Sequence, residues 1–279
     1  MNTFAAMWVV SIGSTFFSAL YFNLNKTIAG SPSYQSVKYI DQSAVNNSVQ
    51  SKGLTFAPKR SQFHTISLQA TGANHWTIFV NQKPILTLSH IADAATVAAR
   101  LEFLLNSSSF DPNKILPVIW NGSYIGQYDL ATLFTVPMVG IANPELNLTQ
   151  WVNNLRQATG AKPLTLVEAQ QQMLQLTATD HSVQGEASWY GWDFHGLPTA
   201  SGETFEQKGF TAAHPSLPLD TYLKVTNLRN GKSVIVRVND RGPYVGDRIL
   251  DLSHAAAIEI DSEQVGVVEI SATVMQTRS

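Results

Sequence analysis

The chain has 279 residues, of which 44% are hydrophobic and 14% charged, which is enough for more than one compact domain with its own core. Its formal net charge is −2, so it lacks the positive field that attracts phosphate backbones, and nucleic acid is not an expected partner. The absence of cysteine excludes disulfides, thiolate metal sites, cysteine nucleophiles and a lipid-modified N-terminal cysteine.

Residues 1–29 form an apolar segment in which no charged side chain precedes Lys26. Thr27 and Ala29 are small residues at positions −3 and −1 relative to Gly30, a pattern typical of signal-peptide cleavage. An uncleaved single-span anchor is the alternative. The segment therefore predicts export to the periplasm or cell envelope, either free or anchored to the inner membrane, and not as a lipoprotein.

Residues 30–53 are rich in Ser, Asn and Gln and show no apolar period, so they are predicted to form a flexible linker. The pattern changes at 54–160 to that of a small α+β domain. Alternating apolar residues predict a hairpin formed by 76–80 and 85–88. Apolar residues spaced at i, i+4, i+7 and i+8 predict an amphipathic helix over 93–106.

The second half of this α+β domain is predicted to contain further strands in 115–139 and a helix that ends at Gly160. It holds no catalytic constellation. Trp76, Trp120 and Trp151 are of the type that stacks on sugars, although aromatic residues at such spacings are more often part of a core. Contact with another envelope or division protein is an alternative role for the domain.

Residues 161–183 are predicted to connect this domain to a third region, 184–275, where short strands are separated by turn residues. Asn230-Gly231 is a strong hairpin signal, and Ser253 is a suitable N-cap for an alanine-rich helix. Many short strands with one helix predict a small β-barrel. The predicted strands include 186–190, 222–226, 233–239 and 267–274.

Unusual polar residues lie in the predicted loops of this barrel. Cleavage of a glycosidic bond needs a carboxyl group that donates a proton, and most hydrolases add a second carboxyl group. Glu203 and Asp240 are the natural pair, with His214 as an orienting neighbour. Each also fits a structural role in a turn, a solvated loop or a hydrogen-bonded imidazole. Histidines without a ligand-type partner at i+3 or i+4 do not predict a metal site, and no cofactor is expected.

The motifs that carry these residues occur in a fixed order along the barrel region. They are Gly185-Glu-Ala-Ser-Trp-Tyr-Gly191, Thr199-Ala-Ser-Gly-Glu203, Thr211-Ala-Ala-His214, Asn239-Asp-Arg-Gly-Pro243 and Arg248-Ile-Leu-Asp-Leu-Ser253. Together they closely resemble the barrel domain of the rare lipoprotein A family. The resemblance covers about a third of the chain.

This resemblance implies a double-psi β-barrel and lytic transglycosylase activity on peptidoglycan glycan strands, preferably strands without stem peptides. Such an enzyme cleaves the β-1,4 bond between N-acetylmuramic acid and N-acetylglucosamine and leaves 1,6-anhydro ends. Asp240, Glu203 and His214 match the family's catalytic residues, and we assign the acid/base role to Asp240, although the order of the two carboxyl groups could be reversed. Substrate contacts are expected from Trp189, Tyr190, His195, Ser201, Asn239 and Arg241. The alternative is a non-catalytic, expansin-like module that binds or loosens the wall.

Overall fold

The structure is a computed structural model that describes residues 63–244 and 246–278. The predicted export segment and the linker, residues 1–53, lie outside the described residues. Within the two described ranges, no helix is long and apolar enough to cross a membrane.

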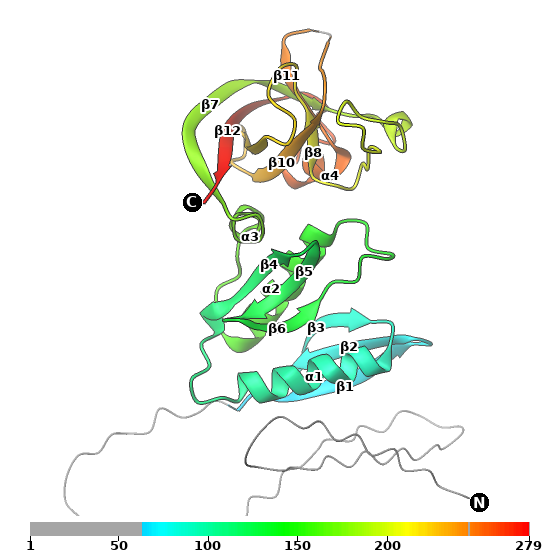
Figure 1. Ribbon diagram of the computed structural model, residues 1–279, viewed down its shortest axis with the longest axis vertical. Coiled ribbons are helices and arrows are strands. Elements are labelled where there is room, and N and C mark those ends of the chain that lie inside the picture. Colours follow the sequence, from blue (N-terminus) through cyan, green and yellow to red (C-terminus); the bar gives the residue numbers. More distant parts are fainter. Residues whose placement is uncertain (1–62, 245, 279) are drawn as a thin grey trace, which may run out of the picture. The chain divides into compact units, whose positions relative to one another are not determined.

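The first part of the described chain is an α+β domain that repeats one pattern, an antiparallel three-stranded meander followed by a helix (Figure 1). The two sheets have the orders β1-β2-β3 and β4-β5-β6. The first repeat consists of β1 (Ile66–Gly72), β2 (His75–Val80), β3 (Lys83–Leu88) and α1 (Ile91–Leu105). The second repeat consists of β4 (Ile115–Trp120), β5 (Ser123–Tyr128), β6 (Ala131–Thr135) and α2 (Pro144–Thr159).

Two-residue turns set the register of both meanders. Asn81 and Gln82 have φ values of 51° and 67°, and the turn at Asn121 and Gly122 has values of 48° and 73°. Left-handed conformation at both turn residues matches the twist of the flanking strands. The first hairpin was predicted from the sequence, but its turn is tighter than expected because Lys83 and Pro84 belong to β3.

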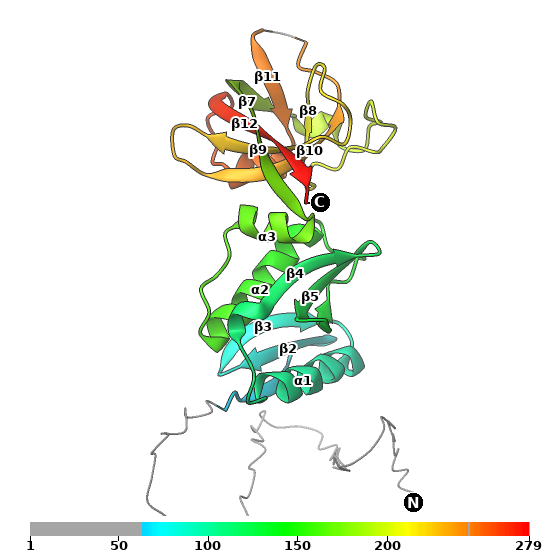
Figure 2. The ribbon, with the colours of Figure 1, turned by 60° about the vertical axis from the view of Figure 1, so that its left-hand side comes forward.

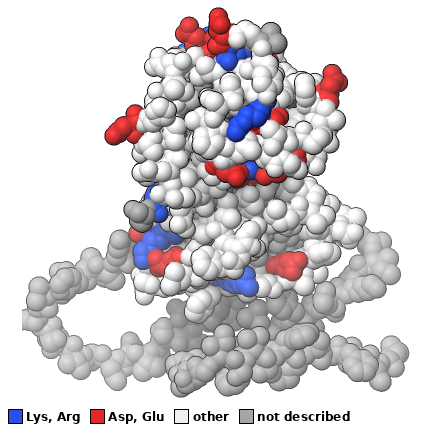
Figure 3. All heavy atoms as spheres, turned by 45° about the horizontal axis from the view of Figure 1, so that its top comes forward, with Lys and Arg blue, Asp and Glu red and all other residues white. Residues whose placement is uncertain are grey.

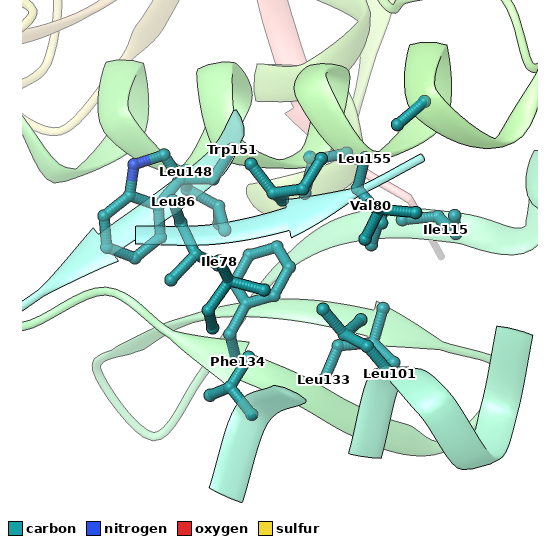
Figure 4. Close-up of a cluster of buried hydrophobic side chains, with 14 of the residues drawn as sticks. Ile78, Val80, Leu86, Leu101, Ile115, Leu133, Phe134, Leu148, Trp151 and Leu155 are labelled. Carbon is teal, nitrogen blue, oxygen red and sulfur yellow. The ribbon is translucent and has the colours of Figure 1, made fainter. Parts of the chain in front are cut away.

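The two repeats share one hydrophobic core (Figure 4). Trp151 of α2 is only 9% exposed and its ring meets the Phe134 ring edge-on at 6.0 Å. A Cβ atom on Gly126 would lie 2.3 Å from Phe134, so only glycine fits opposite this ring. Trp151 is therefore a core residue, whereas Trp120 at the end of β4 is 66% exposed.

The segment predicted to be a connector, 161–183, contains a short helix and the start of a barrel strand. It contains α3 (Leu166–Met173), which begins with a capping box between Thr165 and Glu168. Met173 is buried in the core of the α+β domain. The segment also contains the first half of β7 (Leu176–Trp189). Gln170 in this helix bonds to the backbone of Ile235, 65 residues later, so a local sequence pattern does not predict this packing.

The second part is a closed six-stranded barrel with the order β10-β8-β11-β7-β12-β9, which confirms the predicted fold class (Figure 2). The pairs β8–β10 and β7–β11 are parallel, and the other pairs are antiparallel. The remaining strands are β8 (Thr211–Ala213), β9 (Tyr222–Asn227), β10 (Ser233–Asp240), β11 (Arg248–Leu252) and β12 (Val268–Thr277), and α4 covers His254–Glu259.

Every second side chain of β10 points into the barrel and contributes to its core. Val234, Val236 and Val238 are fully buried in its core, because side chains at every second position of a strand lie on the same side. Ile235 points to the other side of the strand, where it packs in a small cluster with Leu176 and Met275. The outward side of β10 is therefore covered near Ile235 and becomes polar toward its carboxyl end.

Candidate functional site

The site lies where β8 and β10 end. Because these strands are parallel neighbours, the residues that end or follow them meet at one edge of the barrel. The backbone N–H of His214 donates to the carbonyl oxygen of Asp240 at 3.2 Å. The register shifts by one residue between Val238 and Asp240, a bulge of the kind that changes the direction of side chains beside active sites. The fold thus brings together two residues that are 26 positions apart in the sequence.

Asp240 accepts three hydrogen bonds. Its Oδ2 accepts from the Tyr190 hydroxyl at 3.0 Å, and its Oδ1 accepts from the backbone N–H groups of Ala200 and Arg241, both at 2.8 Å. Burial, and then the neighbouring Asp240, raise the pKa of Tyr190 well above its usual range. Tyr190 therefore stays protonated and acts as a donor to Asp240.

Glu203 has a different environment. Its two oxygens accept hydrogen bonds from Arg237, at 2.9 Å from Nη1 to Oε1 and at 2.7 Å from Nη2 to Oε2. Asn239 Nδ2 adds a bond of 3.2 Å to Oε2, and Asp220 accepts a bond of 2.8 Å from Arg237. The hydrogen bonds from Arg237 are the main cause that lowers the pKa of Glu203. Glu203 is thus held as a carboxylate.

His214 presents a defined tautomer. Its Nδ1 accepts from the backbone N–H groups of Ser216 at 3.1 Å and Leu217 at 2.9 Å, so the proton of the neutral ring is assigned to Nε2. Burial, and then the charge of Arg241, lower the pKa of His214. The imidazole is therefore neutral near pH 7 and can donate a hydrogen bond through Nε2.

Three of the predicted substrate-contact residues hold the loops around these groups. Ser201 N–H donates to the Asn239 carbonyl at 3.1 Å, and its hydroxyl lies 2.9 Å from that of Thr199. Arg241 Nη1 is 3.4 Å from the carbonyl oxygen of His214. With Tyr190, these residues belong to the same cluster as Asp240.

Two other predicted contact residues have partners elsewhere. Trp189 donates from its indole N–H to the Glu263 carbonyl at 3.2 Å and its ring lies 5.0 Å from that of His254. His195 is exposed, and its Nδ1 lies 3.7 Å from Glu206. Neither has a recorded contact with the residues around Asp240.

Arg237 was not among the residues predicted from the sequence. The alternation of valines in β10 shows that its side chain points away from the barrel core, two residues before Asn239. That pattern does not identify a partner. Pairing with Glu203 depends on a loop 34 residues earlier, which only the tertiary structure places.

Figure 3 shows small separate groups of acidic and basic side chains on the face it presents, without one large patch of a single sign. Among residues 63–244 and 246–278, no group of three or more His, Asp or Glu side chains could hold a metal ion.

A family model described as "Lytic transglycolase" matches residues 182–272, the barrel. The chain is 37% identical over 231 residues to a probable endolytic peptidoglycan transglycosylase RlpA of Synechocystis, and the match covers 72% of both chains. It is 55% identical over 93 residues to the endolytic peptidoglycan transglycosylase RlpA of Pseudomonas aeruginosa, covering 33% of this chain and 27% of that protein. A Clavibacter michiganensis expansin has a TM-score of 0.29 at 20% identity, covering 36% of this chain and 52% of that one.

The match to the Synechocystis protein is much longer than the barrel, so the shared sequence includes a large part of the preceding region. With the P. aeruginosa protein, only about a third of this chain is shared. The identity and the length shared with the Synechocystis protein show that the chain belongs to the rare lipoprotein A (RlpA) family.

Proposed function

We propose that the protein is an endolytic peptidoglycan transglycosylase that acts on glycan without stem peptides. The observation that carries this proposal is that two carboxyl groups in one site have different hydrogen-bond partners. Glu203 is fixed as an anion by Arg237, whereas Asp240 is held by a phenol hydroxyl and two backbone N–H groups without a cationic partner. Different environments assign different roles to paired carboxyl groups.

Asp240 is the proposed acid and base. Its protonated form donates to the oxygen of N-acetylglucosamine as the bond from that oxygen to C1 of N-acetylmuramic acid breaks. The 6-hydroxyl of the muramic acid then attacks C1, and its proton passes to the Asp240 carboxylate. The product is a 1,6-anhydro ring, and Asp240 returns to its starting state without the use of water.

Glu203 and His214 have supporting roles. A fixed carboxylate stabilises the positive charge that develops on the sugar ring as the bond breaks. Because Glu203 is already occupied by Arg237 and Asn239, it is poorly suited to activate a water molecule. The Nε2–H group of His214 is a donor that can orient a sugar hydroxyl.

Incubation of the full chain with peptide-free glycan tests the proposal by mass spectrometry. Products with anhydro ends are expected from the parent, and Asp240→Asn should reduce their rate at least 100-fold. Asp193→Asn, a matched substitution of an exposed aspartate, should leave the rate unchanged. Products with reducing ends would show a hydrolase instead.

A non-catalytic, expansin-like wall-binding module is the weaker second candidate, favoured by the 60% exposed Trp192, whose face can stack on a sugar. Equal sedimentation of the parent and of Asp240→Asn with glycan, without products from either, would support it.

We also propose that the protein is exported to the periplasm or cell envelope, because its substrate lies there and residues 1–29 are apolar. Fractionation of cells that produce the full chain tests this location. Contact of the α+β domain with another envelope or division protein is a further proposal, and co-purification after cross-linking in cells tests it.

A further inference from the structure

A cavity of about 420 Å³ adjoins Glu203, and residues of both the α+β domain and the barrel line it. Tyr124 of β5 and Glu145 of α2 line it from the α+β domain. Glu203, Arg237 and Tyr222 line it from the barrel. Its volume lies in the range of small-molecule sites. The α+β domain thus supplies one wall of a cavity whose other wall contains a proposed catalytic residue.

Buried hydrogen bonds fix this wall to the barrel. Gln170 of α3 is fully buried, and its amide pairs with the backbone of Ile235 through two bonds of 2.8 Å, as a neighbouring strand would. The same Nε2 donates to Glu145 at 3.0 Å. Asn143 Nδ2 donates to the Lys208 carbonyl at 2.8 Å. Because Ile235 precedes Arg237 by two residues in β10, these bonds hold the wall in register with the Glu203–Arg237 pair.

The cavity offers unused hydrogen-bonding groups beside aromatic rings. Tyr124 and Tyr222 are half-buried, and within the described part of the chain neither hydroxyl has a hydrogen-bond partner. Burial, and then Glu145, raise the pKa of Tyr124 to about 12, so its hydroxyl stays protonated. Burial also raises the pKa of Glu145. A sugar ring with hydroxyl and acetamido groups matches both the rings and these polar atoms.

Charge in the cavity selects between the two sugars of peptidoglycan. Among the lining residues, Arg237 is the cation, and both its Nη atoms are already bonded to carboxylates. Glu203 and Glu206 add acidic groups. The lactyl carboxylate of N-acetylmuramic acid would meet these like charges without a free cation, which is unfavourable in a partly buried site. N-acetylglucosamine carries no such group.

We propose that this cavity is a subsite for an N-acetylglucosamine ring next to the reacting muramic acid, with Tyr124 of the α+β domain as a specificity-determining residue. The inference rests on the proposed function, since it takes Glu203 as part of the cleavage site. It gives the α+β domain a direct role in binding the glycan strand.

The test uses the full chain carrying Asp240→Asn, which binds without turnover. Calorimetric titration with chitotetraose, a tetramer of N-acetylglucosamine, measures the binding of this sugar without the carboxylates of muramic acid. Adding Tyr124→Ala should raise the Kd about tenfold, and Tyr124→Phe, which keeps the ring, about threefold. Phe103→Ala removes an aromatic ring that is 81% exposed on α1 and should leave the Kd unchanged.

An unchanged Kd for both Tyr124 variants would overturn the inference. Circular dichroism shows whether each variant is folded, and the milder Tyr124→Phe removes only the hydroxyl, so weaker binding by a folded variant reports a lost contact. Failure of the proposed function has a different signature, because the parent chain would then release no anhydro products whatever Tyr124 does to binding.

Discussion

Arg237 holds Glu203 through two parallel hydrogen bonds, 2.9 Å from Nη1 to Oε1 and 2.7 Å from Nη2 to Oε2. This relationship separates two carboxyl groups that the sequence presents as equivalent candidates. A bidentate guanidinium fixes both the charge and the direction of a carboxylate. Within the described part of the chain Asp240 has no such partner, so proton donation is assigned to Asp240.

Replacing Arg237 by Gln should remove the two hydrogen bonds that fix the Glu203 carboxylate. Loss of the guanidinium should raise the pKa of Glu203 toward its ordinary value of 4.5, shift the acid limb of the activity profile to higher pH, and lower kcat about tenfold to 100-fold. Arg237→Lys keeps the charge but not the two parallel bonds, and an intermediate rate is expected. Arg229→Gln, at an exposed arginine, is the control. An unchanged pH profile in Arg237→Gln would contradict this role.

The same pair predicts how stability depends on pH. Because the pKa of Glu203 is lowered in the folded chain, its contribution is fully present above the unfolded value near 4.5 and is lost as the pH falls through the lowered folded value. Urea unfolding of the parent should therefore lose stability more steeply than that of Arg237→Gln as the pH falls below about 4.5. Parallel curves for the two proteins would refute the linkage.

Tyr190→Phe should weaken catalysis without weakening binding. The substitution removes the hydroxyl that donates to Asp240 Oδ2 and keeps the ring, which packs 4.9 Å from that of Phe205. A kcat about tenfold lower with KM within twofold of the parent is expected, since the lost bond positions the acid/base. Tyr244→Phe, at a tyrosine that is 83% exposed, is a matched control. Steady-state kinetics measures both variants. Equal kcat values for Tyr190→Phe and Tyr244→Phe would contradict the positioning role of the Tyr190 hydroxyl.

His214 should carry its proton on Nε2. Two backbone N–H groups occupy Nδ1, and burial lowers the pKa of the ring, so the neutral form with Nε2–H is expected at pH 7. Nitrogen-15 NMR of the labelled full chain distinguishes the two ring nitrogens. The titration midpoint should lie below the ordinary value of 6.5. A protonated Nδ1 in the neutral ring, or a midpoint above 6.5, would contradict the assignment.

Gln170→Ala should destabilise the chain by about 2–4 kcal/mol. The substitution leaves the buried N–H and carbonyl groups of Ile235 without their partners and removes a bond to Glu145. Gln172→Ala, two residues along the same helix and without a recorded side-chain hydrogen bond, should change stability by less than about 0.5 kcal/mol. Denaturant unfolding measures both. Equal stabilities would show that the α3–β10 contact has little energetic weight.

Much of the local structure could be predicted from residues that act on their immediate neighbours. The hairpin formed by 76–80 and 85–88 and the helix that ends at Gly160 were both predicted from the sequence. The strand predicted over 233–239 was confirmed as β10, and its alternating valines lie in the barrel core. These features follow from backbone preference and apolar periodicity, which operate over a few residues.

The role of residues 161–183 was harder to predict. Gln170 is a polar residue in a glutamine-rich run, which is typical of an exposed segment, yet it is fully buried because Ile235 lies against it. Its burial is favourable only when both backbone groups of a distant strand are there to bond with it. No local pattern contains that information.

The sequence by itself determined a small barrel, its order of motifs, and the residue types Glu203, His214 and Asp240, since these depend on turn chemistry, periodicity and resemblance to a family. The tertiary structure decided which carboxyl group is paired with Arg237, which nitrogen of His214 is free, and that Tyr124 and Glu203 line the same cavity. Hydrogen bonds and cavity walls join residues far apart in the chain, so their partners exist only after the strands and loops have packed.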